Sequence, residues 1–254
     1  MEENTQTTVS VQRDMSALYT PIAIIVAGVV IAVGLFFGLS HSSTKVVDGN
    51  GTAQAPAIPV NIKDVKTDGE PFIGKSDAPV VMAFWSDFQC PYCKAVETGG
   101  VPQIKITAAM PEIIKKYVDT GKLKIVFKDF PFLGSDSTTA GEYARAIWAL
   151  YPNQYYAWRT AMFKAQDEEG DQGFGNAKTI DQLIVGSFPS IDDAAVKSAV
   201  GKNKTEYDAL MQKDMEEGAK FGVQGTPGFI TGTKIIAGAA QFASFAAAID
   251  PQLK

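Results

Sequence analysis

The sequence predicts an α/β domain that follows an N-terminal membrane-spanning helix. Three observations lead to this prediction: an uncharged run from Pro21 to Leu39, a strand–helix–strand pattern over residues 79–128, and a long helical block followed by two more strands. The chain has 254 residues, of which 46% are apolar and 20% charged, so it can bury a real core.

The uncharged run is the first predicted element. Its nineteen residues would form a helix about 28 Å long, close to the hydrocarbon thickness of about 30 Å. A cleaved signal peptide is the main alternative, but it would begin with a basic segment, and the leading segment here contains one arginine and three acids. We therefore expect a polar tail over residues 1–20, an uncleaved single-span anchor over 21–40 and a flexible tether over 41–62.

The charged residues exclude one class of function and leave the orientation of the span open. The formal net charge is -5 and no Lys/Arg cluster occurs along the chain, so we predict no nucleic-acid binding. The nearest basic residues on the two sides of the span are Arg13 and Lys45. Because this count is a tie, charge alone does not orient the span.

The remaining part of the chain, residues 63–254, begins with a β-α-β unit. Pro79–Trp85 (PVVMAFW) is a short apolar run, typical of a strand that is buried on both faces. Pro91–Thr120 is predicted to be mostly helical, and Lys122–Lys128 (KLKIVFK) to be the second strand. Strand, helix and strand at this spacing predict a parallel pair joined by a right-handed crossover.

A helical block and a β-β-α unit complete the predicted order. Residues 137–221 carry apolar side chains at helical spacing and form a predicted helical insertion. Residues 228–231 and 234–237 predict a hairpin that turns at Gly232 and Thr233, and residues 241–249 predict a final helix that ends before a proline. Three large aromatic residues of the block are expected in its core: Trp148, Trp158 and Phe163.

Both cysteines of the chain lie in one short stretch, FWSDFQCPYCK, from Phe84 to Lys94. A structural zinc site needs four ligands, but the chain supplies only Cys90, Cys93 and a single histidine, His41, in the tether, so we predict no metal. A structural disulfide is a second alternative. A bridge that closes so short a loop adds little stability.

The position of the pair favours a reactive dithiol instead. Both cysteines follow a predicted strand at the start of a predicted helix, where unpaired N–H groups and the helix dipole stabilise an anion. In such a setting a cysteine pKa falls from about 8.5 to between about 3.5 and 7.5. We expect Cys90 to be the more exposed nucleophile, Cys93 the resolving thiol and Pro91 the first helical residue.

These segments resemble the DsbA family of thiol–disulfide oxidoreductases, above all its membrane-anchored bacterial members. FWSDFQCPYCK resembles the active-site segment of that family. The resemblance continues through PFIGKSDAPVV (71–81), KIVFKDFPF (124–132) and GVQGTPGFITG (222–232), and it spans roughly residues 70–250. It implies a thioredoxin-like fold with an inserted helical subdomain, and no cofactor.

The resemblance also implies further site residues and partners. In thioredoxin-like folds a cis-proline lies beside the cysteines, and the residue before it aligns the extended substrate chain; Pro227 and Thr226 match these positions. Pro91 and Tyr92, between the cysteines, complete the supporting set. The implied substrates are extended, cysteine-containing proteins outside the cytoplasm, where disulfides persist. The implied re-oxidant of an oxidase in this family is a quinone-linked membrane protein.

Three features depart from the family pattern. The strand before the cysteines lacks the acid that many thioredoxin relatives use in proton transfer, and the nearest acid is Asp87. The dipeptide between the cysteines is Pro-Tyr, as in glutaredoxins, and not the Pro-His of strong oxidants. Four residues interrupt the long helix expected after the cysteines: Gly99, Gly100, Pro102 and Pro111.

Three functions are compatible with these residues. The first is an oxidase that forms disulfides in secreted or envelope proteins. The second is a reductase or isomerase that uses the same dithiol, since the direction depends on a reduction potential that the sequence does not give. The third is a binding module that uses the face around Thr226 and Pro227 without chemistry.

Overall fold

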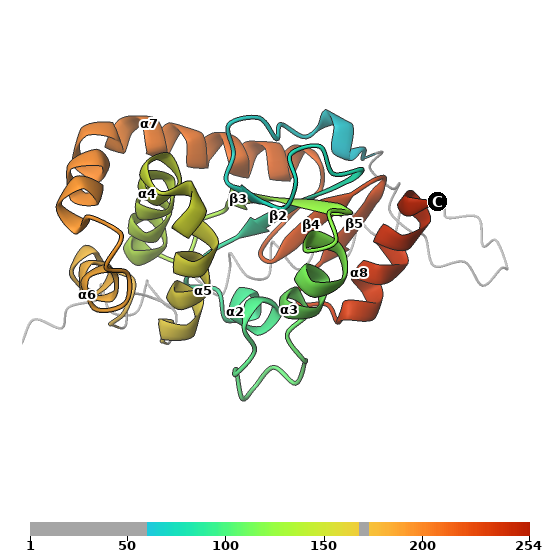
Figure 1. Cartoon of the computed structure of the whole chain (residues 1–254), viewed down its shortest axis with the longest axis horizontal. Coiled ribbons are helices and arrows are strands. Elements are labelled where there is room, and N and C mark those ends of the chain that lie inside the picture. The colour runs from blue at the N-terminus through green and yellow to red at the C-terminus, as the bar shows by residue number, and fades with distance from the viewer. Residues whose placement is uncertain (1–59, 168–172) are drawn as a thin grey trace, which may run out of the picture. The chain divides into compact units, whose positions relative to one another are not determined.

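A computed structural model of the chain describes residues 60–167 and 173–254 (Figure 1). The predicted tail, the predicted anchor and nearly all of the predicted tether lie outside these ranges. Within the two described ranges, no helix has both the length and the hydrophobicity that a membrane crossing requires.

A five-stranded mixed sheet lies at the centre of the described region, in the order β1-β3-β2-β4-β5. β2 (Val80–Ser86) and β3 (Leu123–Asp129) are parallel, as predicted. β4 (Gly228–Thr231) runs antiparallel to β2 and forms the predicted hairpin with β5 (Lys234–Ala237). The sequence did not reveal β1 (Phe72–Ile73), which pairs with β3, because two residues are too few to show a periodic pattern.

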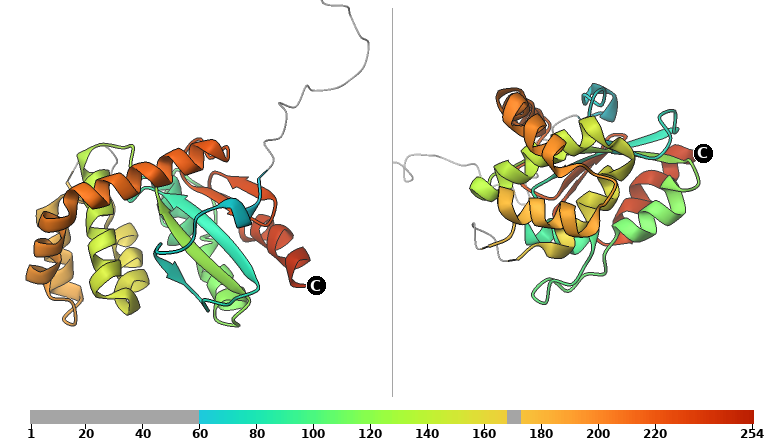
Figure 2. Two further views of the ribbon diagram at one scale, coloured as in Figure 1. Left: turned by 90° about the horizontal axis from the view of Figure 1, so that it is seen from above. Right: turned by 60° about the vertical axis from the view of Figure 1, so that its left-hand side comes forward.

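Helices surround this sheet and form a separate block beside it. In Figure 1, α2, α3 and α8 lie below the sheet, and α4, α5 and α6 stand to its left. The long helix α7 runs from this block across to the sheet, as the left view of Figure 2 shows, and it contacts β3. The helical elements are η1 (Ile62–Asp64), α2 (Pro91–Glu97), α3 (Met110–Ile113), η2 (Ile114–Val118), α4 (Ser135–Leu150), η3 (Pro152–Gln154), α5 (Tyr155–Ala165), α6 (Ala177–Ser187), α7 (Asp193–Lys220), α8 (Phe242–Ile249) and η4 (Asp250–Leu253). The predicted helical insertion and final helix are thus confirmed.

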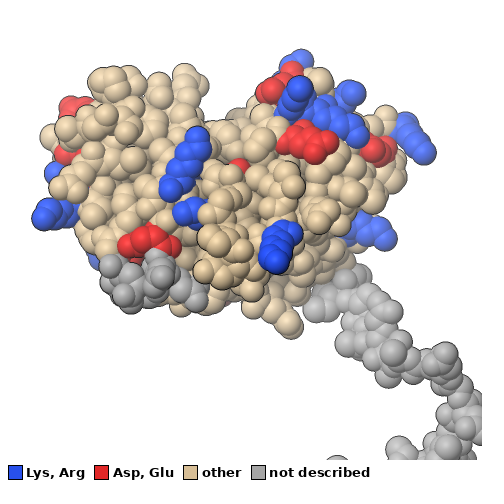
Figure 3. All heavy atoms as spheres, turned by 90° about the horizontal axis from the view of Figure 1, so that it is seen from below, with Lys and Arg blue, Asp and Glu red and all other residues tan. Residues whose placement is uncertain are grey.

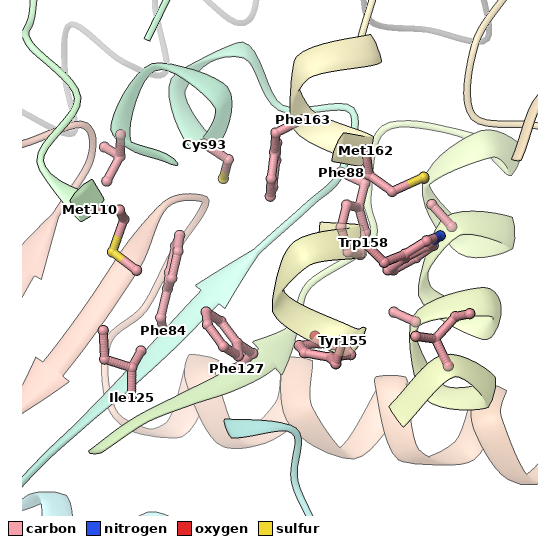
Figure 4. Packing of buried hydrophobic residues seen from close by; sticks show 14 of the residues in the cluster. Phe84, Phe88, Cys93, Met110, Ile125, Phe127, Tyr155, Trp158, Met162 and Phe163 are labelled. Carbon is pink, nitrogen blue, oxygen red and sulfur yellow. The ribbon is translucent and has the colours of Figure 1, made fainter. Parts of the chain in front are cut away.

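The core confirms that β2 is buried on both of its faces. On one face, Phe84 stacks on Phe229 of β4 with ring centroids 4.2 Å apart, and Figure 4 shows Phe84 in the core beside Met110 and Phe127. On the other face, Trp85 is fully buried and its indole N–H donates a 2.8 Å hydrogen bond to the main-chain oxygen of Asp214 in α7. The helical block has the aromatic core expected of it: Trp158 and Phe163 are fully buried, and Trp148 is partly buried.

A buried ionic cluster joins the helical block to the sheet. Arg145 of α4 pairs with Asp129 at the end of β3 and also with Asp214 of α7. Lys128 of β3 pairs with the same Asp214. Because a buried charge without a partner costs several kcal/mol, removing one partner of such a cluster is expected to weaken this junction. Two further carboxylates complete the cluster: Glu70 and Glu217.

The helix that follows the cysteines is interrupted, as expected. α2 ends at Glu97, α3 begins at Met110, and residues 98–109 form a loop between them, here named the crossover loop. Gly99 and Gly100 have φ values of 70° and 78°, in the left-handed region where glycine is favoured. Figure 1 shows the crossover loop extending below α2 and α3.

Candidate active site

The two cysteines lie where β2 ends and α2 begins, and both are free thiols. Cys90 is the residue before the helix and has an extended backbone (φ −75°, ψ 118°). Its side chain makes no hydrogen bond that caps the helix. Pro91 is the first helical residue, as predicted, where its missing N–H leaves no helical hydrogen bond unmade. Cys93 follows within the first turn of α2.

The two thiols differ in their surroundings. Cys93 is fully buried, and Figure 4 shows it pointing from α2 toward the interior beside Phe163. Cys90 is only 4% exposed, so it is the more accessible of the two by a small margin. Tyr92 between them is 52% exposed and projects from the surface.

Thr226 and Pro227 lie beside the cysteines, although they are far away in sequence. The Cys90 thiol donates a hydrogen bond of 3.4 Å to the main-chain oxygen of Thr226. The bond between Thr226 and Pro227 is cis, and Pro227 is buried. The pairing of β4 with the end of β2, where Gly228 is opposite Trp85, brings these residues together.

The site favours a thiolate at Cys90. The pKa of Cys90 is lowered to about 7, first because the Cys93 thiol hydrogen-bonds to it and also because Thr226 and the N–H groups of Cys93 and Tyr92 do so; burial opposes these effects. Cys90 therefore ionises much more readily near neutral pH than an ordinary cysteine does. Burial raises the pKa of Cys93 well above its ordinary value, and the negative charge on Cys90 raises it further.

The Thr226 hydroxyl is a second group of this residue near the cysteines. Its oxygen is buried and makes no hydrogen bond within the described residues. Its interaction with either sulfur lowers that cysteine's pKa. A buried hydroxyl that is unpaired in the dithiol form gains a partner when Cys90 ionises.

Asp87 does not direct its carboxylate at the sulfurs. It accepts hydrogen bonds from the N–H groups of Gln89, Phe132 and Leu133 and from the Ser137 hydroxyl, so it fastens the loop before α4 to the active-site segment. Burial raises the pKa of the Asp87 carboxyl. Asp87, the acid nearest to the cysteines in sequence, is therefore held by hydrogen bonds that stabilise the fold.

A second buried acid lies on α2 itself. Glu97 is one turn beyond Cys93, and it pairs with Arg159 of α5 at 2.7 Å and accepts a 3.1 Å hydrogen bond from the Tyr156 hydroxyl. The Arg159 guanidinium lies 4.3 Å from the centre of the Phe127 ring. The sequence did not indicate this pair, because its members are 62 residues apart and each sits in an ordinary helical pattern.

Two hollows flank the cysteines, and the crossover loop lines both. One, of about 520 Å³, lies beside Thr226 and Tyr92, and its apolar wall includes Ile104 and Ile106. The other, of about 640 Å³, lies between the crossover loop and the end of α5. Figure 3 shows this side of the molecule, from below, with few acidic or basic side chains in its middle.

One residue that contacts the active-site segment was not predicted. The Gln166 side chain donates to the main-chain oxygens of Phe88 and Cys90, and Lys94 Nζ donates to the Gln166 main-chain oxygen. No local pattern marks Gln166, because it lies 76 residues from Cys90. Among the described residues, no group of three or more His, Cys, Asp or Glu side chains is placed to hold a metal.

Comparisons with known proteins agree with this geometry. The thioredoxin family model matches residues 66–251. A probable disulfide bond formation protein D from Bacillus anthracis is 25% identical over 182 residues, which cover 72% of this chain and 77% of that protein. The disulfide bond formation protein D of Bacillus subtilis is 25% identical over 186 residues, covering 73% and 78%.

Solved structures share the fold. The crystal structure of oxidised BdbD from Bacillus subtilis has a TM-score of 0.65 and 23% identity, covering 78% of this chain and 98% of that one. Chlamydia trachomatis DsbA has a TM-score of 0.60 and 17% identity, covering 74% and 93%. The chain therefore belongs to the thioredoxin family, as a DsbA-like protein-disulfide oxidoreductase.

Proposed function

We propose that this chain forms or exchanges disulfides in cysteine-containing proteins of the cell envelope, through Cys90 and Cys93. The observation that carries the proposal is the unequal pair of thiols at the start of α2. The more accessible Cys90 has a pKa of about 7, and the buried Cys93 ionises at a much higher pH. This inequality supports Cys90 as the nucleophile and Cys93 as the resolving thiol.

The thiol–disulfide exchange proceeds in two steps. In the oxidising direction, a substrate thiolate attacks Cys90 of the Cys90–Cys93 disulfide, and Cys93 leaves as a thiolate that takes up a proton. A second substrate thiolate then attacks the substrate sulfur of the mixed disulfide, and Cys90 leaves as a thiolate. The stabilised Cys90 thiolate is the better leaving group, so this second step releases the oxidised substrate.

The surface beside Cys90 suits an extended substrate chain. The main-chain oxygen of Thr226 lies next to the sulfur and can align a strand-like segment. The hollow that contains Tyr92 and Ile104 offers apolar contact for side chains on either side of the substrate cysteine. Substrate main chain would thus bind at Thr226, with side chains received by the crossover loop.

The direction of electron flow has two candidates. The printed names of the Bacillus relatives, disulfide bond formation protein D, favour an oxidase. The pKa of Cys90, about 7, favours a weaker oxidant or a reductase, because it equals the value typical of thioredoxin, whereas the strong oxidant DsbA has about 3.5. The Pro91–Tyr92 dipeptide between the cysteines is consistent with the second candidate.

We place the domain outside the cytoplasm, held by a single-pass anchor over residues 21–40 and a tether over 41–62. The uncharged run and the Pro/Gly-rich segment after it support this arrangement. An oxidase anchored in this way would be re-oxidised by a quinone-linked membrane protein, as the family resemblance implies.

One measurement separates the candidates: the equilibrium between the Cys90–Cys93 pair and glutathione. A potential near about −120 mV identifies an oxidase and one near about −270 mV a reductase. A variant without both cysteines tests the chemistry itself. If that variant kept full activity and partner binding, the chain would be a binding module and the proposal would be wrong.

A further inference from the structure

The connection between α5 and α6 contacts the active-site segment near both of its ends. At its start, the main-chain oxygen of Gln166 accepts a 2.7 Å hydrogen bond from Lys94 Nζ. Near its end, the main-chain oxygen of Phe174 accepts a 2.9 Å hydrogen bond from Gln89 Nε2. Asp167 accepts a 2.7 Å hydrogen bond from the Phe174 N–H and so joins the two ends. The helical block therefore contacts the active-site segment on both sides of the cysteine pair, at Gln89 and at Lys94.

The Gln166 side chain also bonds to main-chain oxygens within the active-site segment. Its Nε2 group donates to the main-chain oxygen of Phe88 at 2.6 Å and to that of Cys90 at 3.1 Å. Gln166 is only 5% exposed, so both hydrogen bonds are shielded from water. A buried carbonyl without a donor is unfavourable, so these bonds can hold the loop in place.

Fixing the Cys90 carbonyl fixes where the Cα–Cβ bond of Cys90 lies relative to the start of α2. The carbonyl also accepts the first helical hydrogen bond, from the Lys94 N–H at 3.1 Å. With two donors on one oxygen, rotation about the Cα–C bond of Cys90 is restrained at its ψ of 118°. That angle sets the position of the Cβ atom relative to the N–H groups of Tyr92 and Cys93, which stabilise the negative charge of the sulfur.

We infer that Gln166 is a positioning residue for disulfide exchange. By holding the carbonyls of Phe88 and Cys90, it keeps the Cys90 sulfur directed at the start of α2 and at Thr226. The inference rests on the proposed reaction at Cys90, and it gives the inserted helical block a part in that reaction.

A glycine in the connection between α5 and α6 allows this connection to approach the active-site segment closely. Gly175 has a φ of +123°, and a Cβ atom there would lie 2.0 Å from Nε2 of Gln89. Any larger residue at this position would push the Gln89 side chain away from Phe174. Glycine is therefore required for the close approach of the connection to the active-site segment.

Gln166→Met is the primary test, because methionine keeps the length of the side chain and removes both N–H donors. The full chain is reduced, and the rate of its alkylation by iodoacetamide is measured against pH. The chain has only two cysteines, and buried Cys93 ionises at much higher pH, so the rate reports the Cys90 thiolate. We expect the rate at neutral pH to fall about two- to five-fold, with the midpoint of the profile moved to higher pH.

Gln166→Glu is the second variant, and it guards against failure of the first to fold. A protonated glutamate can serve only one of the two carbonyls, so its alkylation rate should lie between those of the wild type and Gln166→Met. The matched control is Gln182→Met, at an exposed glutamine on α6 that bonds to neither carbonyl. Its profile should equal that of the wild type.

Two results would overturn the inference. One is an unchanged alkylation profile in Gln166→Met with only a lower melting temperature, which would mean that Gln166 merely satisfies buried carbonyls. The other is an equal change in Gln182→Met. Alkylation needs no protein substrate, so the outcome is readable even if the variant without both cysteines rejects the proposed exchange activity.

Discussion

The sulfur of Cys90 lies 3.4 Å from the main-chain oxygen of Thr226, although the two residues are 136 positions apart. Cys90 ends the segment that follows β2, and Thr226 precedes β4, which pairs with β2. Any sulfur that bonds to Cys90 therefore comes next to the main chain before β4. The predictions below test the parts of this arrangement one at a time.

Cys93→Ser should accumulate covalent mixed disulfides with its protein partners. Without the resolving thiol, a bond between Cys90 and a substrate sulfur has no intramolecular route to release. Non-reducing gel electrophoresis followed by mass spectrometry detects the adducts. Cys90→Ser is the matched control and should trap nothing, and equal trapping by both variants would reject the assigned roles.

Thr226→Val should raise the pKa of Cys90 above about 7. Valine has nearly the shape of threonine but cannot donate a hydrogen bond to the thiolate. We expect iodoacetamide alkylation at neutral pH to slow by about two- to five-fold, as a pKa rise of about half a unit to one unit requires. Thr120→Val, at an exposed hydroxyl that bonds only within its own turn, is the control. An identical profile for wild type and Thr226→Val would show that the hydroxyl does not act on the sulfur.

Ile104→Asp should weaken substrate use without changing the thiol. The aspartate places a charge in the apolar wall of the hollow beside Tyr92 and Thr226. We expect kcat/KM for oxidation of a reduced protein substrate to fall about tenfold, mostly through KM, while alkylation of Cys90 is unchanged. Val185→Asp adds the same charge at a site on α6 that is 69% exposed, and it should have no effect. If the two variants behave alike, this hollow does not receive substrate.

Asp214→Asn should change how stability depends on pH. Burial raises the pKa of Asp214 to about 6, despite the attraction of Arg145 and Lys128. Between about pH 4 and pH 6 the folded state binds this proton more tightly than the unfolded chain, so this carboxyl makes folding less favourable as the pH rises. The other charged groups of the cluster are Glu70, Asp129 and Glu217.

Urea unfolding at several pH values in this interval measures the effect. The free energy of unfolding of the wild type should fall relative to that of Asp214→Asn as the pH rises, by on the order of 2 kcal/mol in total. Parallel curves for the two proteins would mean that Asp214 does not titrate in this range.

Local patterns were sufficient for most of the elements. Apolar runs predicted β2 and β3, the glycine-containing turn predicted the β4–β5 hairpin, and the Gly/Pro residues of 99–111 predicted the break after α2. Each of these signals lies within a few residues, because strand burial, turns and helix breaks depend on neighbouring side chains. β1 was missed because it owes its extended state to pairing with β3 and not to its own two residues.

The candidate site was predicted only in part. Spacing and the helix start identified Cys90 and Cys93, and family resemblance supplied Thr226 and Pro227. Gln166 could not be found in this way, because a lone glutamine after a helix is unremarkable until the fold sets it against two carbonyls. The small exposure of Cys90 likewise depends on what packs around it, and it is lower than the sequence led us to expect.

The sequence by itself determined the dithiol, the start of its helix and the order of the elements around it, since these depend on residue type and short spacing. The family resemblance pointed to Thr226, and only the tertiary structure showed how close it lies to the Cys90 sulfur and which other groups surround the active-site segment: Gln166 from the end of α5 and the wall of the crossover loop. The physical reason is that thiol ionisation depends on burial and on donors within hydrogen-bond reach. Those contacts form only when segments separated by 76 to 136 residues pack together.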